Sequence, residues 1–336
     1  MEHDAISMAL NIDKYLANCW LVVRKGTWLE RQGGRAGAKV IAINFSGSFS
    51  VSAIVRMRKL WREQQIKNII FLGSSEIKSI HFSLTTGVEK FIVRHGTTKS
   101  SPKKDFVRRL TWSKVTAHWC ISQHLEKNVR SLFPVGDAEV FVNYVALGSK
   151  LNEIPHAKQL TARSDSFELV HVGRLVQGKG QRDVLSAAKR LRDHGIPVHV
   201  SLYGDGDDNQ YLVDLAKQLG IEECVRFMGY VDSPFSHFDK YHAFVYPSHG
   251  EGLGNAFIEA LASGIHCFSY QNTVFPELKS LGLSFYMAPD RDVASLAEDL
   301  KEVWEARSPV NQGNVELCQN VFSVEAEMDA LKGYLC

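Results

Sequence analysis

Short apolar runs alternate with amphipathic stretches along nearly the whole chain, and this alternation limits the folds that it can adopt. The apolar runs have the length of strands, and the stretches between them show the 3.6-residue period of helices. Such alternation is typical of parallel sheets with helices packed on their faces. At 336 residues the chain exceeds what one hydrophobic core usually serves, so we expect two such domains.

The predicted strands fall into two groups separated by a polar segment. In the first half we expect strands at Trp20–Val23, Lys39–Ile43, Ile69–Leu72, Phe91–Arg94, His118–Ile121 and Val140–Val142, with a helix at Val51–Glu63. In the second half we expect strands at Glu168–Val172, Val198–Tyr203, Val225–Phe227, Ala243–Tyr246, His266–Tyr270 and Ser284–Met287, with helices at Gly180–His194 and Tyr211–Leu219. Residues 151–166 lack periodicity and contain Pro155, which predicts a linker between domains at 1–150 and 167–320.

Composition excludes several classes of protein. Hydrophobic residues at 45% and charged residues at 23% argue against a disordered or fibrous chain. The six cysteines have no paired spacing, so we expect neither a metal site nor a disulfide framework. Glu2 and Asp4 stand where a signal peptide carries lysines, and no apolar run approaches the ~18 residues of a membrane span. We therefore expect a cytoplasmic protein.

A glycine-rich turn with two cations follows the strand predicted at Glu168–Val172. Its sequence runs from Gly173-Arg174 to Lys179-Gly180 and leads into a helix. Glycines allow close backbone approach, the helix start presents free N–H groups, and Arg174 and Lys179 supply positive charge for phosphate oxygens. The turn therefore suits a diphosphate, although an ordinary surface turn with solvated cations would contain the same residue types.

A second glycine-rich loop follows the strand predicted at Ala243–Tyr246 and contains Gly252 and Gly254. Backbone amides and the positive end of the following helix can hold phosphate there. Glu251 precedes that helix and Glu259 lies inside it, and two carboxylates suit the hydroxyls of a sugar or ribose. Both glutamates could instead be solvated charges at a helix end. A third loop, Gly204-Asp205-Gly206, has the composition of a plain turn.

Taken together, GR-x4-KG, then G-D-G, then two glutamates separated by seven residues resemble the retaining GT4-type glycosyltransferases of the GT-B fold. The resemblance implies an α/β fold with two Rossmann-like domains facing across a cleft, and a C-terminal helix at 321–336 that returns to the N-terminal domain. It also implies that Arg174 and Lys179 bind the donor diphosphate, that Glu259 binds the ribose, and that Glu251 binds the sugar. The full predicted donor site is Gly173, Arg174, Lys179, Gly204, Asp205, Tyr230, Glu251, Gly252, Leu253, Gly254, Asn255 and Glu259.

The first half resembles the family less closely. Val93–Thr97 is similar to the histidine loop that faces the donor, so His95 is the candidate for the reaction centre, with Glu251, Arg174 and Lys179 as the other predicted catalytic residues. Members usually begin with a strand and a glycine-rich loop, whereas the first recognisable element here is a helix around Ala5–Ala17. We therefore expect that first strand to be missing, either from this domain or because the recorded start lies downstream of the true one.

A basic segment follows the histidine loop. Between Arg94 and Lys114 there are seven basic residues and the single acid Asp105. We expect this segment to bind an anionic glycan or glycolipid acceptor, such as a lipopolysaccharide core, or the membrane surface that carries it. The predicted acceptor residues are His95, Thr97, Lys99, Lys103, Lys104 and Arg108. Solvated helix faces would explain the same charges.

The expected reaction moves a sugar from a nucleoside diphosphate sugar, linked to UDP or GDP, with retained anomeric configuration. We expect no metal and no other cofactor, because the cations and the helix start can stabilise the leaving diphosphate. That leaving group is expected to take the proton of the acceptor itself. Two alternatives remain, a nucleotide-sugar epimerase of related fold and a nucleic-acid-binding protein that uses the basic segment, although aromatic residues are not interleaved with its cations.

Overall fold

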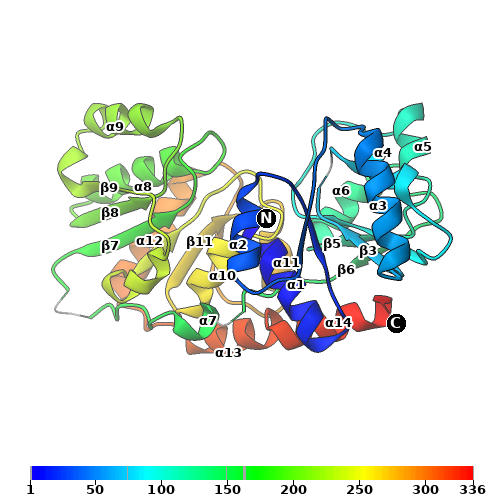
Figure 1. Cartoon of the computed structure of the whole chain (residues 1–336). Helices are drawn as coiled ribbons and strands as arrows, with labels where there is room; N and C mark the ends of the chain where they lie inside the picture. Colours follow the sequence, from blue (N-terminus) through cyan, green and yellow to red (C-terminus); the bar gives the residue numbers. More distant parts are fainter. Residues whose placement is uncertain (1, 74, 149, 162–163, 336) are drawn as a thin grey trace. The chain divides into compact units, whose positions relative to one another are not determined.

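The computed structural model describes residues 2–73, 75–148, 150–161 and 164–335 (Figure 1). The chain divides into two compact units. Unit 1 consists of residues 1–145 and 324–336, and unit 2 consists of residues 146–323. The chain thus leaves unit 1 once and returns to it for its last helix.

Unit 1 contains parallel strands in two sheets. Its strands are β1 (Leu21–Arg24), β2 (Val40–Ile43), β3 (Asn68–Phe71), β4 (Lys90–His95), β5 (Ala117–Cys120) and β6 (Glu139–Val142). Its helices are α1 (Glu2–Tyr15), α2 (Trp28–Arg35), α3 (Val51–Glu63), α4 (Ile77–Ser83), α5 (Phe106–Trp112), α6 (Gln123–Leu132) and α14 (Val324–Leu335). Strands β1 and β2 pair with each other, and the larger sheet has the order β3-β4-β5-β6.

The larger sheet of unit 1 is covered by helices from both ends of the chain. Met8 of α1 and Met328 of α14 belong to one buried cluster with Trp119 of β5. The side chain of Asn143 donates a 3.0 Å hydrogen bond to the backbone oxygen of Glu327, which ties the end of β6 to α14. The C-terminal helix is therefore part of the core of unit 1.

Unit 2 is built on one parallel sheet with the order β12-β11-β10-β7-β8-β9. Its strands are β7 (Phe167–Val172), β8 (Val198–Tyr203), β9 (Val225–Gly229), β10 (Ala243–Val245), β11 (His266–Tyr270) and β12 (Tyr286–Ala288). Its helices are α7 (Lys150–Glu153), α8 (Gln181–Asp193), α9 (Asn209–Gln218), α10 (Asn255–Ala262), α11 (Phe275–Ser280), α12 (Val293–Ala306), α13 (Gln312–Val321) and the 3-10 turns η1 (Glu222–Cys224) and η2 (Pro234–Lys240).

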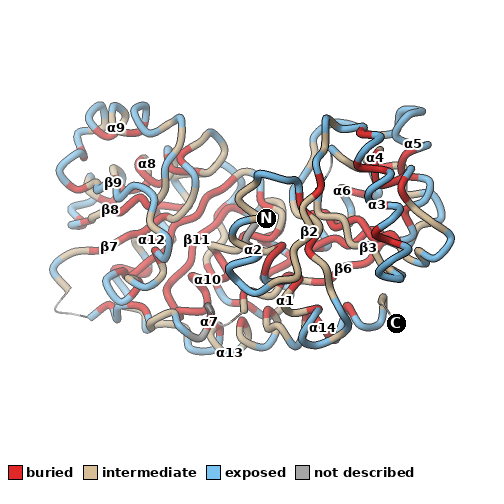
Figure 2. Tube along the Cα trace, viewed as in Figure 1, coloured by how far each residue is buried: buried red, intermediate tan, exposed pale blue. Residues whose placement is uncertain are grey.

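The strand order of unit 2 reverses at β7. The chain runs outward from β7 through β8 to β9, and then resumes on the other side of β7 with β10. In open parallel sheets, ligands bind beyond the carboxyl ends of the strands at such a reversal, because the flanking loops diverge there. Figure 2 shows that β7, β8 and β11 are mostly buried and that the outer faces of the helices are exposed, while the edge strand β9 is largely exposed.

The segment expected to be a linker, residues 151–166, belongs to unit 2 instead. Leu151 and Leu160 are buried, the backbone nitrogen of Ala157 donates to the carbonyl oxygen of Ser263 (3.0 Å), and Lys158 donates in the same way to Tyr241 (3.0 Å). The prediction was wrong because isolated apolar residues anchor the segment without producing a periodic pattern. Residues 162 and 163 lie outside the described part of the chain.

Candidate functional site

Two loops meet at the reversal of the unit 2 sheet. One leaves β7 and reaches α8 through Gly180, and the other leaves β10 and reaches α10 through Gly254. Gly180 has a φ of +85°, and a Cβ at that position would lie 2.4 Å from the carbonyl oxygen of Pro247. Glycine is therefore required there, since any side chain would push the two loops apart.

Hydrogen bonds fix the same two loops to each other. The backbone nitrogen of His249 donates to the carbonyl oxygen of Gly178 (2.8 Å), and the hydroxyl oxygen of Ser248 lies 3.2 Å from the same oxygen. The β10 loop is thus held against the β7 loop by backbone contacts, and the side chains that it carries have fixed positions.

The end of β8 joins this arrangement through Gly204. Its φ is +135°, and a Cβ would lie 1.9 Å from the carbonyl oxygen of Gly173. Its backbone nitrogen donates to the carbonyl oxygen of Gly229 at the end of β9 (2.8 Å). Close backbone packing, rather than a turn preference alone, therefore explains the glycine in this loop.

Glu251 is the centre of the polar contacts at the site. Its Oε1 accepts hydrogen bonds from Lys179 Nζ (2.5 Å), from the hydroxyl of Tyr246 (2.8 Å) and from the hydroxyl of Ser248 (2.8 Å). Lys179 comes from the β7 loop and the other three residues come from the β10 loop, so the ion pair also joins the loops. The Glu251 residue is only 9% exposed.

The three bonds orient the Glu251 carboxylate. All of them reach Oε1, and in the described part of the chain Oε2 accepts no hydrogen bond. Burial, together with the nearby Glu251 charge, raises the pKa of Tyr246 well above its usual value, so its hydroxyl keeps its proton and donates. One carboxylate oxygen is thus fixed by the protein, and the other can accept a hydrogen bond from a ligand.

A buried histidine contacts the β7 loop and holds it in place. His171 Nε2 accepts a hydrogen bond from the side-chain amide of Gln181 (3.1 Å), and its Nδ1 bonds to the carbonyl oxygen of Val245 (2.8 Å). The same amide donates to the backbone oxygen of Arg174 (2.8 Å). Burial lowers the pKa of His171 to about 4, so the ring is neutral near pH 7 and its hydrogen lies on Nδ1.

A second set of contacts holds the β10 loop. His249 Nε2 lies 3.4 Å from Asp183 Oδ2, and the same oxygen accepts a 3.0 Å hydrogen bond from the hydroxyl of Tyr270. The amide of Asn272 donates to the backbone oxygen of Ser248 (3.2 Å). Residues of α8 and of the loop after β11 therefore hold the loop that carries Glu251.

The other predicted donor residues lie at the same edge of the sheet, at different depths. Arg174, Asp205 and Tyr230 are exposed, and Tyr230 exposes 73% of its surface. Leu253 is buried, so only its backbone can meet a ligand. Glu259 is half-buried on α10, which begins at Asn255 after Gly254, a residue with a φ of +79°.

The predicted residues of the first half lie in unit 1. His95 ends β4 and is 8% exposed, and its Nε2 is 3.0 Å from Nδ1 of His118. Its ring stacks on Trp112 and meets Phe133 edge-on. Burial, and then the neighbouring His118, lower the pKa of His95 to about 3. The His95 ring is therefore neutral near pH 7 and lies inside unit 1. The catalytic role of His95 stays a prediction.

The predicted acceptor residues occupy the loop and helix that follow β4. Lys103 donates through its backbone to the carbonyl oxygen of Leu132 (2.7 Å), and Arg108 is paired with Asp105 (2.5 Å). Thr97, Lys99 and Lys104 are part of the same stretch and are exposed or half-buried. The structure brings these residues together in unit 1, separately from the donor residues of unit 2.

The match to a known protein family lies in unit 2, which carries the candidate site. Residues 153–314 match the family described as glycosyl transferases group 1, and this range contains both loops and their glutamates. The match covers most of unit 2 and just under half of the chain, so unit 2 is similar to this family. The resemblance on which the sequence analysis relied is thereby confirmed.

Relatives with assigned names match about half of the chain. A glycogen synthase of Mycobacterium tuberculosis is 29% identical over 184 residues, which is 54% of this chain and 44% of the relative. The lipopolysaccharide core biosynthesis glycosyltransferase LpsD of Rhizobium meliloti is 29% identical over 147 residues, which is 43% of this chain and 40% of the relative. The chain thus spans less than half the length of either relative.

A solved structure extends the likeness to the whole chain. Alr3699/HepE of Anabaena, crystallised in complex with UDP, is similar with a TM-score of 0.81 and 14% identity, over 98% of this chain and 95% of that one. This likeness establishes the fold. It is the α/β fold of the GT-B class with two Rossmann-like domains, as the sequence predicted.

Sequence reasoning overlooked several residues of this candidate site. Tyr246 and Ser248 bond to Glu251, and His171 and Gln181 support the β7 loop. Ser248 lies three residues before Glu251 in a short loop, and that spacing was the one available signal for it. Tyr246, His171 and Gln181 showed no comparable signal, because their contacts depend on how the loops fold.

Over residues 2–73, 75–148, 150–161 and 164–335, no group of three or more histidine, cysteine or acidic side chains is arranged to hold a metal ion. No helix in the described ranges combines the length and the apolar character needed to span a bilayer.

Proposed function

We propose that this chain is a retaining glycosyltransferase, which moves a sugar from a nucleoside diphosphate sugar to a hydroxyl of a glycan or glycolipid. The observation that carries the proposal is the pair of Lys179 and Glu251 at the reversal of the unit 2 sheet. A cation and an oriented carboxylate on adjoining loops suit a ligand that has a phosphate beside a hydroxyl group. The match of residues 153–314 to the group 1 family and the UDP complex of the similar HepE structure support it.

The diphosphate is the part of the donor that we assign to the cations. Lys179 lies beside the strand reversal, and Arg174 is on the same loop with an exposed side chain that can turn toward a ligand. The start of α10 adds backbone N–H groups around Gly254 and Asn255. These groups stabilise the negative charge that develops on the leaving diphosphate, so the proposed reaction needs no metal ion.

The sugar and the ribose are assigned to the two glutamates. Glu251 accepts a hydroxyl of the transferred sugar through Oε2, because its Oε1 is already bonded to three donors of the protein. Glu259, one turn into α10, accepts the hydroxyls of the ribose. The nucleobase would then lie beside the end of β9, where Gly229 is bonded to Gly204 and Tyr230 exposes its ring.

We propose that the anomeric configuration of the sugar is retained, because the motifs of this chain resemble those of the retaining members of the family. The leaving diphosphate takes the proton of the acceptor hydroxyl on the face from which it departs. If His95 takes part, it acts as a neutral ring, since burial holds its pKa at about 3. It can then donate or accept one hydrogen bond, but it does not supply positive charge.

The acceptor is proposed to be an anionic glycan or glycolipid of a bacterial envelope, such as a lipopolysaccharide core. The basic stretch of unit 1 supports this choice, as does the name of the relative LpsD. We place the reaction in the cytoplasm at the inner face of the plasma membrane. The cysteines at 19, 120, 224, 267 and 318 are free, which suits a reducing compartment.

The test is the fate of the donor with and without an acceptor. UDP- and GDP-sugars are incubated with the chain alone and with deacylated lipopolysaccharide core oligosaccharides, and the products are identified by NMR. Donor consumption that requires the acceptor, with the anomeric configuration kept, supports the proposal. Isomerisation of the donor alone would identify an epimerase, and an inverted product would reject the retaining reaction. Lys179→Met is the control, because it should abolish any genuine turnover while the fold persists.

A further inference from the structure

Helix α5 exposes its apolar side chains. Phe106 is 80% exposed, Val107 49% and Leu110 48%, whereas the buried residues of the helix are Thr111 and Trp112. At about 100° per residue, the three exposed apolar residues lie within about 100° of the helix surface, and Trp112 lies on the opposite side. An ordinary surface helix has the reverse arrangement.

The exposed apolar side chains lie on a helix with a regular N-terminal cap. Asp105 caps its first turn, since its carboxylate accepts a hydrogen bond from the backbone nitrogen of Arg108 (3.1 Å). Scattered single apolar residues on a surface need no explanation, but three on one face of a two-turn helix form a patch. The patch points to a partner with an apolar layer.

Cations surround the apolar face. Lys103, Lys104, Arg108 and Arg109 lie on or just before α5, and the acid among them, Asp105, is already paired with Arg108. Lys104 and Arg109 form no ion pair with any carboxylate of the described residues. Arg109 lies about 60° round the helix axis from Phe106, so positive charge adjoins the apolar patch.

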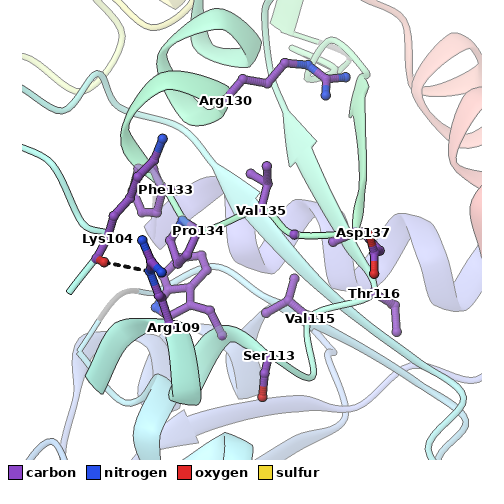
Figure 3. A pocket seen from close by; sticks show the side chains of 13 residues that line it. Lys104, Arg109, Ser113, Val115, Thr116, Arg130, Phe133, Pro134, Val135 and Asp137 are labelled. Atoms are coloured by element: carbon purple, nitrogen blue, oxygen red, sulfur yellow. Dashed lines mark hydrogen bonds between the residues drawn. The ribbon is translucent and has the colours of Figure 1, made fainter. Parts of the chain in front are cut away.

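A pocket of about 800 Å³ opens on the flank of α5 that carries Arg109 (Figure 3). Lys104, Arg109 and Arg130 line it, and Asp137 is the one acid among its lining residues. Trp112 and Phe133, whose ring centroids are 5.0 Å apart, form part of its apolar wall. Thr116 and Ala138 place its floor at the amino ends of β5 and β6, and the ring of His95 contacts the same two wall residues, Trp112 and Phe133.

We propose that unit 1 binds the surface of an anionic phospholipid bilayer through α5 and this pocket. The apolar face of α5 enters the boundary between headgroups and acyl chains, and Lys104 and Arg109 bind lipid phosphates beside it. A soluble phosphate would explain the pocket but leaves the exposed apolar face without a partner, whereas an amphiphile explains both. The inference extends the proposed function, because it names the surface through which a transferase would reach a lipid-linked acceptor.

The test is co-sedimentation of the full chain with vesicles, which needs no sugar donor and is therefore separate from the test of transfer. Vesicles of phosphatidylglycerol and phosphatidylcholine in equal parts are compared with phosphatidylcholine alone. We expect binding to the anionic vesicles only, and weaker binding as salt is raised. Phe106→Ser should weaken it about tenfold, and Lys104→Ala with Arg109→Ala about thirtyfold.

The control is Tyr211→Ser, which removes an exposed ring from α9 of unit 2 and should leave vesicle binding unchanged. All the substituted side chains are exposed or half-buried, and circular dichroism confirms that each variant is folded before it is tested. Equal binding to both kinds of vesicle, or unchanged binding of Phe106→Ser, would overturn the proposal. So would displacement from the vesicles by inorganic phosphate at constant ionic strength, which would identify a site for free phosphate.

Discussion

The ion pair between Lys179 and Glu251 should couple the two loops of the donor site energetically. Its atoms lie 2.5 Å apart, and the side chains are 21% and 11% exposed. We compare Lys179→Met, Glu251→Gln and the double variant with the unchanged protein. Gln keeps an oxygen that accepts from Tyr246 and Ser248, so the substitution removes the charge and leaves those neutral hydrogen bonds in place.

The expected magnitude lies between two known limits. Exposed ion pairs contribute about 0–1 kcal/mol, while removing one partner of a fully buried pair costs about 3–5 kcal/mol. This pair is mostly buried but touches solvent, so each single variant should lose about 2 kcal/mol. The double variant should lose about 1–2 kcal/mol less than the sum of the two, because the second substitution removes a charge that has already lost its partner.

Calorimetry is the suitable measurement, because it can resolve the unfolding of the two units as two separate transitions. Only the transition of unit 2 should move, by about 4–8 °C for each single variant. The matched pair is Lys189 and Asp193 on α8, which is more exposed and should show coupling of at most about 0.5 kcal/mol. If the losses at Lys179 and Glu251 are additive within about 0.5 kcal/mol, the argument that this pair joins the loops is refuted.

Two further predictions concern unit 2. Gly204→Ala should destabilise it by at least about 2 kcal/mol, since a Cβ would lie 1.9 Å from a backbone oxygen and φ is +135°. The control Gly250→Ala should be neutral, because the space around its Cβ is open. Equal melting temperatures of the two variants would contradict this prediction. His171 has a folded pKa of about 4, below its usual 6.5, so the unfolded chain takes up a proton first as the pH falls. Stability should therefore drop between pH 6.5 and 4, by about 2 kcal/mol at pH 5, and urea titrations should show that His171→Gln flattens this dependence.

Local patterns were enough to predict the strands and the site loops. Each predicted strand overlaps an observed one, and Val198–Tyr203 and His266–Tyr270 coincide with β8 and β11. The reason is that buried parallel strands are short, continuous apolar runs, which the sequence displays directly. The loops after β7 and β10 were found because glycines, cations and glutamates follow strands at fixed spacing.

Contacts that depend on the folded path of the chain were beyond such patterns. Nothing local to Gln181 indicates that its amide joins His171 to the backbone of Arg174. The segment around Leu160 was taken for a linker because a single buried leucine has no periodicity. The apolar face of α5 was also overlooked, since Phe106, Val107 and Leu110 show the spacing of a core-facing helix and only the structure reveals that this face is exposed.

The central claim is that the loops after β7 and β10 hold the diphosphate of a sugar donor. Isothermal titration of UDP, GDP, ADP and TDP into the unchanged protein and into Lys179→Met tests it most directly. At least one of these nucleotides should bind, and Lys179→Met should weaken its binding by about tenfold to a hundredfold, because a charged hydrogen bond to phosphate is lost. The matching nucleoside without phosphate should bind equally to both proteins. Equal affinities of the diphosphate for both proteins, or no binding of any of the four, would contradict the claim.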